Sequence, residues 1–244
     1  KEILINWVKQ GGTLIANNRS TRLLASDNEF GDVKLLQQTF EDAKSYNIDL
    51  MREIYSLDNN LNKNDVNSNR VNFEINYPWE SSDKTYSKDQ LEMRDKWQSL
   101  LMPSGSMVSA RSDQQHWLTF GTEDLIPILY ANNPILMTGG NSEAPIRIGE
   151  LIQNDEAAES RMINWSQVPK GYDLNVRMSG LVWPEASQRI ANSAYLTREK
   201  IGKGQIILFS GEPNFRGSAR GTNRLWLNAV IYGSGLGTNT LVTQ

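Results

Sequence analysis

The stretch Q-I-I-L-F-S-G-E-P-N-F-R-G at residues 205–217, followed by A-R-G-T-N-R-L-W-L-N-A-V-I-Y at 219–232, decides the fold class. Residues 205–209 form a short apolar run that predicts a buried strand. Glycine and proline then break the run, and residues 222–232 carry apolar side chains at helical spacing, which places Leu225, Trp226, Ala229 and Val230 on one face. Upstream, the glycine-rich segment 200–204 joins residues 194–197 to the run and predicts a hairpin. The pattern is hairpin, loop and helix, typical of an α/β layer.

The beginning of the chain repeats the alternation of helix and strand. Residues 1–10 predict an amphipathic helix with Ile3, Leu4, Trp7 and Val8 on one face, and two glycines at 11 and 12 end it. Residues 13–16 predict a short buried strand that runs into an elbow at 17–20. A chain that starts inside an α/β unit is expected to be a piece of a longer protein; the alternative is an ordinary start with one N-terminal helix.

The middle of the chain adds helices and strands of the same α/β pattern. Residues 20–57 are helix-permissive, and an asparagine-rich run at 58–72 predicts a polar insertion. A short strand is expected over 71–75. A helix is expected over 87–101, with Ser87 and Gln90 forming a capping box. Strands are expected at 107–111, 126–129, 135–137 and 146–152, whereas 154–172 shows no clear period. Because no linker interrupts the pattern, residues 1–244 are expected to be a single domain.

Composition excludes several classes of function. The 244 residues contain no cysteine, so thiolate metal sites, disulfides and a cysteine nucleophile are excluded within them. One histidine, His116, cannot supply the two or three imidazole ligands of most catalytic zinc centres. The net charge of −3 argues against nucleic-acid binding through bulk positive charge. No run approaches the ~20 apolar residues of a membrane-spanning helix, and no signal peptide is recognisable in this chain.

Few residues could carry catalysis. The elbow at 17–20 lies where α/β hydrolases and amidotransferases hold a nucleophile, but it contains neither G-x-S-x-G nor cysteine, and Ser20 is better placed as a helix N-cap. His116 next to Trp117 is expected to be a structural, hydrogen-bonded residue. One alternative stays open: a cysteine-free hydrolase that uses Ser20 or Ser210 with His116 as its base.

The loop after the strand at 205–209 is a candidate ligand site. Residues 198–224 hold six basic and two acidic side chains, a local charge of +4. Asn214, Arg216, Arg220 and Arg224, with glycine N–H groups and a helix N-terminus, could bind a carboxylate or phosphate. The alternative is that the arginines pair with Glu185, Glu199 or Glu212 and fix the loop. Phe215 is expected to pack inward.

Three segments carry a resemblance to a known family. Residues 202–217 with 220–233, residues 7–16 (W-V-K-Q-G-G-T-L-I-A), and residues 103–111 (P-S-G-S-M-V-S-A-R) with 116–121 (H-W-L-T-F-G) resemble the C-terminal part of bacterial secreted zinc carboxypeptidase-like proteins. In that family a carboxypeptidase-A-like catalytic domain precedes a class I glutamine-amidotransferase-like domain. The resemblance spans most of the chain, although residues 20–90 contribute little to it.

The resemblance implies a fold and a role. It implies a flavodoxin-like three-layer sandwich with a mostly parallel central sheet, which could lack its first βα unit. It implies a non-catalytic accessory domain, periplasmic or secreted, that stabilises the parent peptidase or positions its substrate. The parent catalytic domain is then the expected partner, with a peptide or anionic ligand as a further one. Zinc is expected in the parent alone, because the H-x-x-E…H ligands are not in this chain. No catalytic or metal residue carries over.

Overall fold

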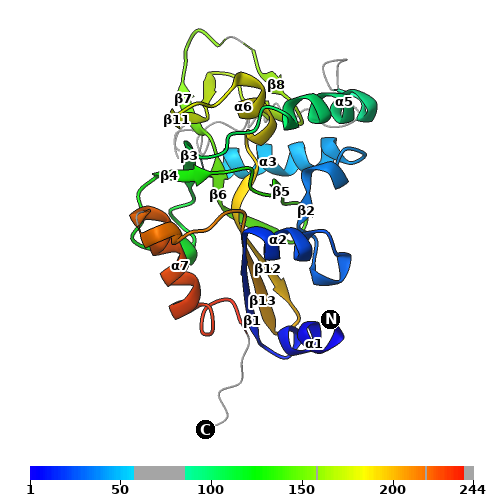
Figure 1. Ribbon diagram of the computed structural model, residues 1–244, viewed down its shortest axis with the longest axis vertical. Coiled ribbons are helices and arrows are strands. Elements are labelled where there is room, and N and C mark those ends of the chain that lie inside the picture. The colour runs from blue at the N-terminus through cyan, green and yellow to red at the C-terminus, as the bar shows by residue number, and fades with distance from the viewer. Residues whose placement is uncertain (58–85, 158, 218, 239–244) are drawn as a thin grey trace, which may run out of the picture.

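A computed structural model describes residues 1–57, 86–157, 159–217 and 219–238 of the chain (Figure 1). The predicted insertion at 58–72 and the strand at 71–75 lie outside these residues. The described helices are α1 (Glu2–Lys9), α2 (Asn18–Ala25), α3 (Ala43–Leu57), α5 (Lys88–Ser99), α6 (Pro184–Ile190) and α7 (Arg220–Tyr232). Single 3₁₀ turns cover Asn28–Phe30, Leu36–Gln38, Trp117–Thr119 and Phe215–Gly217. Among the described helices, none is both long enough and apolar enough to cross a membrane.

The described strands form one large sheet and two small ones. They are β1 (Thr13–Asn17), β2 (Lys34–Leu35), β3 (Ser106–Ser112), β4 (Leu125–Tyr130), β5 (Leu136–Met137), β6 (Ser142–Ile148), β7 (Glu150–Gln153), β8 (Arg161–Ile163), β9 (Ser166–Val168), β10 (Tyr172–Asn175), β11 (Arg177–Ser179), β12 (Ala194–Ile201) and β13 (Gly204–Phe209). The large sheet has the order β1-β13-β12-β6-β3-β11, with β4 also on β3, and β5 joining β12 to β2. Strands β10 and β7 pair with each other, as do β8 and β9.

The expectation of a mostly parallel sheet is wrong. Within the described part of the large sheet, β1 and β13 are the one pair of named strands that runs parallel, and the other strand pairings are antiparallel. Parallel neighbours need a crossover of a dozen or more residues, usually a helix. Strands β12 and β13 are joined by the tight turn at 202–203, which forces them to pair antiparallel, whereas β6 and β12 pair antiparallel across the intervening segment 149–193. The chain is an α/β protein with a mixed sheet.

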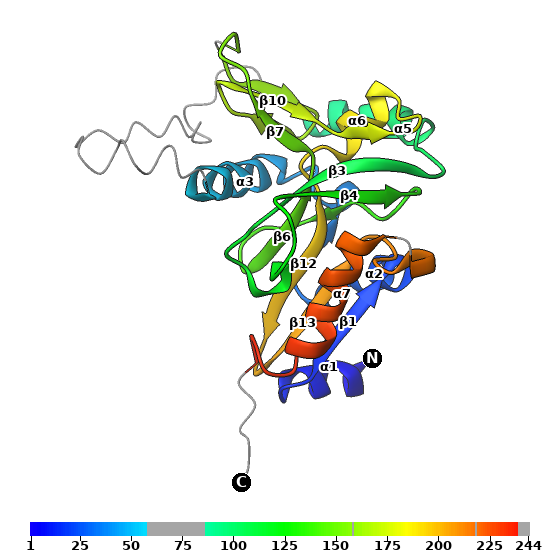
Figure 2. The same ribbon diagram turned by 90° about the vertical axis from the view of Figure 1, so that its left-hand side faces the viewer.

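Strand β13 divides two cores on the two faces of the sheet. Ile207 and Phe209 belong to a core that includes α7, whereas Ile206 and Leu208 belong to one that includes α1 and α2. The alternation follows from the two-residue period of a strand whose faces are both covered. The centroids of the Phe209 ring and the Trp226 ring of α7 are 5.6 Å apart. Figure 2 shows α7 running along this end of the sheet, which is therefore three layers deep.

Local signals are confirmed where capping or turn chemistry dictates them. Ser87 caps α5 through a reciprocal capping box, in which Ser87 Oγ accepts from Gln90 N–H at 3.3 Å and Gln90 Oε1 accepts from Ser87 N–H at 2.9 Å. The hairpin of β12 and β13 forms with a Gly202 φ of +62° in its turn. The predicted strand at 146–152 is instead two strands, because Gly149 at φ +103° interrupts it between β6 and β7.

Three expectations about helix faces and caps are wrong. Helix α1 buries Ile5 and Val8, whereas Trp7 stays half exposed and lies over Gly12, where a Cβ would meet its ring at 2.5 Å. In α7, Val230 is 53% exposed, so it is not part of the inner face. Ser20 lies inside α2 and is not its N-cap, because the helix begins at Asn18. In α1 and α7 the buried face is displaced around the helix, and the N-cap of α2 is Asn17, three residues before Ser20.

Candidate functional site

The elbow between β1 and α2 has the local geometry that the strand-to-helix pattern predicts. Strand β1 ends at Asn17, and Asn18 begins α2 with φ of +46°, in the left-handed region. Asparagine is one of the few residues besides glycine that visit this region routinely. Thr21 Oγ1 donates to the carbonyl of Phe209 at 2.8 Å and ties the elbow to the end of β13. The elbow therefore presents an amide where hydrolases and amidotransferases present a nucleophile.

The loop after β13 meets this elbow at the same edge of the sheet. Asn17 pairs with Phe209 in the parallel register of β1 and β13, so both strands end side by side. Asn18 Nδ2 donates to Glu212 Oε1 at 3.3 Å. The structure thus brings together the elbow and the glycine-rich loop, two features that the sequence indicates separately. Their contact is an amide–carboxylate hydrogen bond between exposed groups.

The four predicted anion ligands do not converge on one point, and each has different contacts. Arg216 has φ of +51° in the 3₁₀ turn before α7, so it does not share a helical face with Arg220 and Arg224. Its guanidinium lies 5.1 Å from the Phe215 ring centroid. Arg224 Nε donates to the carbonyl of Phe120 at 3.0 Å. Arg220 and Asn214 are exposed.

The alternative expectation for this loop also needs correction. Glu199 accepts the backbone N–H of Asp32, and Glu212 accepts the amide of Asn18, so the described contacts of these carboxylates are not with the loop arginines. Phe215 is half-buried rather than part of the core. The loop is held instead by Thr222, whose hydroxyl donates to the carbonyl of Pro213 at 2.6 Å.

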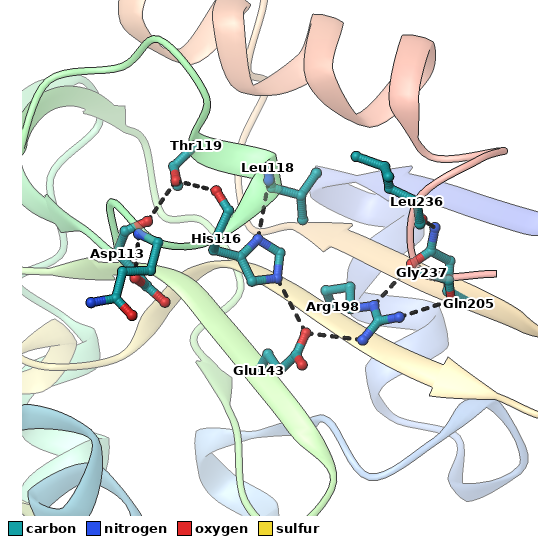
Figure 3. Close-up of polar contacts among 10 residues, drawn as sticks. Asp113, His116, Leu118, Thr119, Glu143, Arg198, Gln205, Leu236 and Gly237 are labelled. Atoms are coloured by element: carbon teal, nitrogen blue, oxygen red, sulfur yellow. Dashed lines mark hydrogen bonds and ion pairs between the residues drawn. The ribbon is translucent and has the colours of Figure 1, made fainter. Parts of the chain in front are cut away.

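His116 is the centre of a polar network that joins several strands (Figure 3). Its Nδ1 accepts the backbone N–H of Leu118 at 3.1 Å, so the ring proton must lie on Nε2. Nε2 then donates to Glu143 Oε2 at 3.2 Å. The ring also stacks on Trp117, with 5.8 Å between the ring centroids. Both ring nitrogens therefore already have partners within the fold.

The network continues from β6 through β12 and β13 to the turn after α7. Arg198 donates to Glu143 Oε2 at 3.1 Å, to Gln205 Oε1 at 2.9 Å and to the carbonyl of Gly237 at 2.8 Å. Gln205 in turn donates to the carbonyl of Gly233 at 2.6 Å. The hydrogen bond from His116, followed by the charge of Arg198, holds the pKa of Glu143 below its ordinary value despite partial burial. We call His116, Glu143, Arg198 and Gln205 the His116 network.

This network has the arrangement of a structural brace rather than that of a general base. A base needs an unoccupied lone pair within reach of a nucleophile. The Nδ1 lone pair of His116 is occupied by Leu118, and Nε2 carries the proton that Glu143 accepts. Ser210 is 1% exposed, and its hydroxyl has no hydrogen-bond partner among the described residues. Ser20 is exposed on α2. Within the described ranges, no group of three or more His, Asp or Glu side chains is placed to hold a metal ion.

A pocket that the sequence analysis did not anticipate lies between α3, the β3–β6 pair and the small β7–β10 sheet. It has a volume of about 190 Å³. Four charged side chains line it, namely those of Glu53, Arg111, Asp113 and Arg147. The rest of the lining is mainly apolar and consists of Ile54, Leu57, Ser112, Ala144, Pro145, Leu151 and Tyr172. A sequence signal existed, because Arg111 and Arg147 each interrupt an apolar strand, where a charged residue is rarely fully buried without a partner.

Arg147 is the more completely satisfied of the two arginines in this pocket. It is 4% exposed, and Glu53 accepts both its Nε and its Nη2 at 2.6 Å. Thr138 Oγ1 accepts from Nη2 at 2.7 Å, and the carbonyl of Asn192 accepts from Nη1 at 3.0 Å. Arg147 thus forms a bidentate ion pair with Glu53, whose side chain is 27% exposed, and has two further acceptors, an arrangement in which a buried guanidinium is tolerated.

The chain matches no model of a known protein family, and neither the curated proteins nor the solved structures contain a significant match.

Proposed function

We propose that this chain is a non-catalytic accessory domain of a zinc carboxypeptidase-like metallopeptidase that stabilises the parent protein or positions its substrate. The His116 network carries the non-catalytic part of the proposal, and the peptidase parent rests on the sequence resemblance. The single histidine of the chain, its most versatile catalytic residue type, is held by Leu118 and Glu143 and braces the sheet against the turn after α7.

The elbow supports the amidotransferase-like part of this proposal. Strand β1, a left-handed Asn18 and helix α2 reproduce a strand–elbow–helix unit, with an amide at the position of the nucleophile. The mixed sheet departs from the flavodoxin-like pattern, so the proposed kinship rests on this unit and on the sequence resemblance. On this proposal the partner is the parent's catalytic domain, which would hold the zinc, in a periplasmic or secreted protein.

A turnover assay tests the proposal. The purified chain, supplied with zinc, should release no amino acid from carboxypeptidase substrates and no ammonia from glutamine above a buffer control. An authentic zinc carboxypeptidase in the same buffer is the positive control. Turnover that is abolished by a chelator, or by His116→Gln in a variant that remains folded, would contradict it. Reading the gene upstream of Lys1 for an H-x-x-E motif tests the assignment of the parent.

A further inference from the structure

The pocket between α3 and the β3–β6 pair contains a guanidinium group that the fold leaves incompletely satisfied. Arg111 of β3 lies directly opposite Arg147 of β6 in the strand register, so both side chains project from the same face of the sheet. Arg147 donates hydrogen bonds to both carboxylate oxygens of Glu53. Arg111 Nη1 donates to the carbonyl of Gly149 at 3.0 Å, whereas its buried Nη2 has no hydrogen-bond partner among the described residues.

An incompletely satisfied cation in this position calls for an acceptor. Burying a charged donor without a partner costs more than burying a neutral one. Burial lowers the pKa of Arg111 to about 10, with Glu53 opposing the shift and Arg147 adding to it. No carboxylate lies within ion-pair distance of Arg111 in the described part of the chain. Asp113, the other charged lining residue, uses Oδ1 to accept the backbone N–H of Gln115 at 2.9 Å.

The rest of the pocket defines the remainder of the ligand. Ile54, Leu57, Pro145 and Leu151 supply apolar walls around a volume of about 190 Å³. A cavity of about 150 Å³ lined by aliphatic and aromatic side chains is enough to bind benzene. The volume therefore suits one ring or one branched alkyl group with a single small polar head, and is too small for a nucleotide.

We propose that this pocket, the Arg111 pocket, binds a small apolar monocarboxylate, with the carboxylate paired to Arg111 and the ring or branched alkyl group against the aliphatic wall. Guanidinium and carboxylate match as a planar bidentate pair, so the head group is selected by geometry as well as by charge. The inference does not depend on the proposed accessory role, since a pocket of this kind can serve a free protein or a domain of a larger one.

Benzoate is the probe that tests the pocket, with benzyl alcohol as a ligand of similar ring size and no charge. Isothermal titration of the intact chain should show saturable, one-to-one binding of benzoate and much weaker binding of benzyl alcohol. In Arg111→Gln, benzoate affinity should fall roughly tenfold or more, the scale of a lost hydrogen-bonded charge pair. Glutamine removes the charge but keeps a side-chain N–H donor, and circular dichroism checks that the variant remains folded.

Two further variants separate the pocket from nonspecific binding. Asp113→Asn keeps Oδ1 for Gln115 but removes a negative charge from the lining, so benzoate should bind more tightly. Leu151→Phe places a larger side chain in the apolar wall of the Arg111 pocket without changing any charge, and it should weaken the binding of benzoate. The proposal is overturned if benzoate fails to saturate the chain, if Arg111→Gln binds it as well as the unchanged chain does, or if benzyl alcohol binds equally well. Binding that survives Leu151→Phe unchanged would also overturn it.

Discussion

Replacing Glu53 by glutamine should destabilise the protein by about 3 kcal/mol, within the roughly 3–5 kcal/mol expected when one partner of a buried ion pair is removed. Arg147 is 4% exposed and donates twice to Glu53 at 2.6 Å. With charge centres about 4 Å apart and an effective dielectric constant of about 20, the direct attraction is about 4 kcal/mol. The expected loss lies at the lower end of the range because Thr138 and the Asn192 carbonyl still accept from Arg147.

Urea denaturation followed by tryptophan fluorescence measures this loss as a lower midpoint with an unchanged slope. The double variant Glu53→Leu/Arg147→Met is the matched control. It removes both charges together, so it should be less destabilised than Glu53→Gln alone. A loss below about 1 kcal/mol in Glu53→Gln is the size of a surface ion pair and would refute the claim that the burial of Arg147 strengthens this pair.

Three smaller perturbations test the elbow, a helix cap and the His116 network. In thermal unfolding, Asn18→Gly should be close to neutral, whereas Asn18→Val should cost roughly 1–2 kcal/mol because a β-branched residue resists a left-handed φ. Ser87→Ala should cost about 1 kcal/mol in urea titration through loss of the α5 cap, and a neutral result would contradict the capping box. Glu143→Gln should destabilise the chain most near pH 7. The pKa of Glu143 is lowered in the folded chain, so its stabilising contribution is present above the unfolded pKa of about 4.3 and is lost as the pH falls through the folded pKa. A loss of unfolding free energy in Glu143→Gln that becomes larger in acid would contradict the network.

Signals encoded over a few residues predict this structure well. The capping box at Ser87 and the glycine turn at Gly202 form as expected, and the helix expected over 222–232 forms two residues longer, from Arg220. Each depends on contacts within about four residues. The strand-to-helix elbow at Asn18 also follows from local pattern. Such features are readable because the groups that satisfy the backbone lie next to it in the chain.

Features that depend on pairing through space were not predicted. The directions in which β3, β6 and β12 pair depend on contacts between segments that are distant in the chain, which the apolar pattern does not specify, and the mostly parallel sheet that the resemblance implies is wrong. The orientation of α1 depends on Trp7 packing across Gly12. In the candidate site, Glu53 and Arg147 are 94 residues apart in the chain, and the carboxylate of Glu143 reaches His116 from 27 residues away. Both contacts are decided by how α3 and the turn at 117–119 pack against β6.

The position of the proton on the imidazole of His116 tests the central claim most directly. The chain has one histidine, so its ring nitrogens give unambiguous signals in a long-range ¹H–¹⁵N spectrum of the labelled protein. If His116 is a structural brace, the spectrum at neutral pH will show a fixed tautomer, with the proton on Nε2 facing Glu143 and an unprotonated Nδ1 that accepts from Leu118. A ring that exchanges freely between tautomers, or that carries its proton on Nδ1 with Nε2 free as a base, would contradict the non-catalytic account.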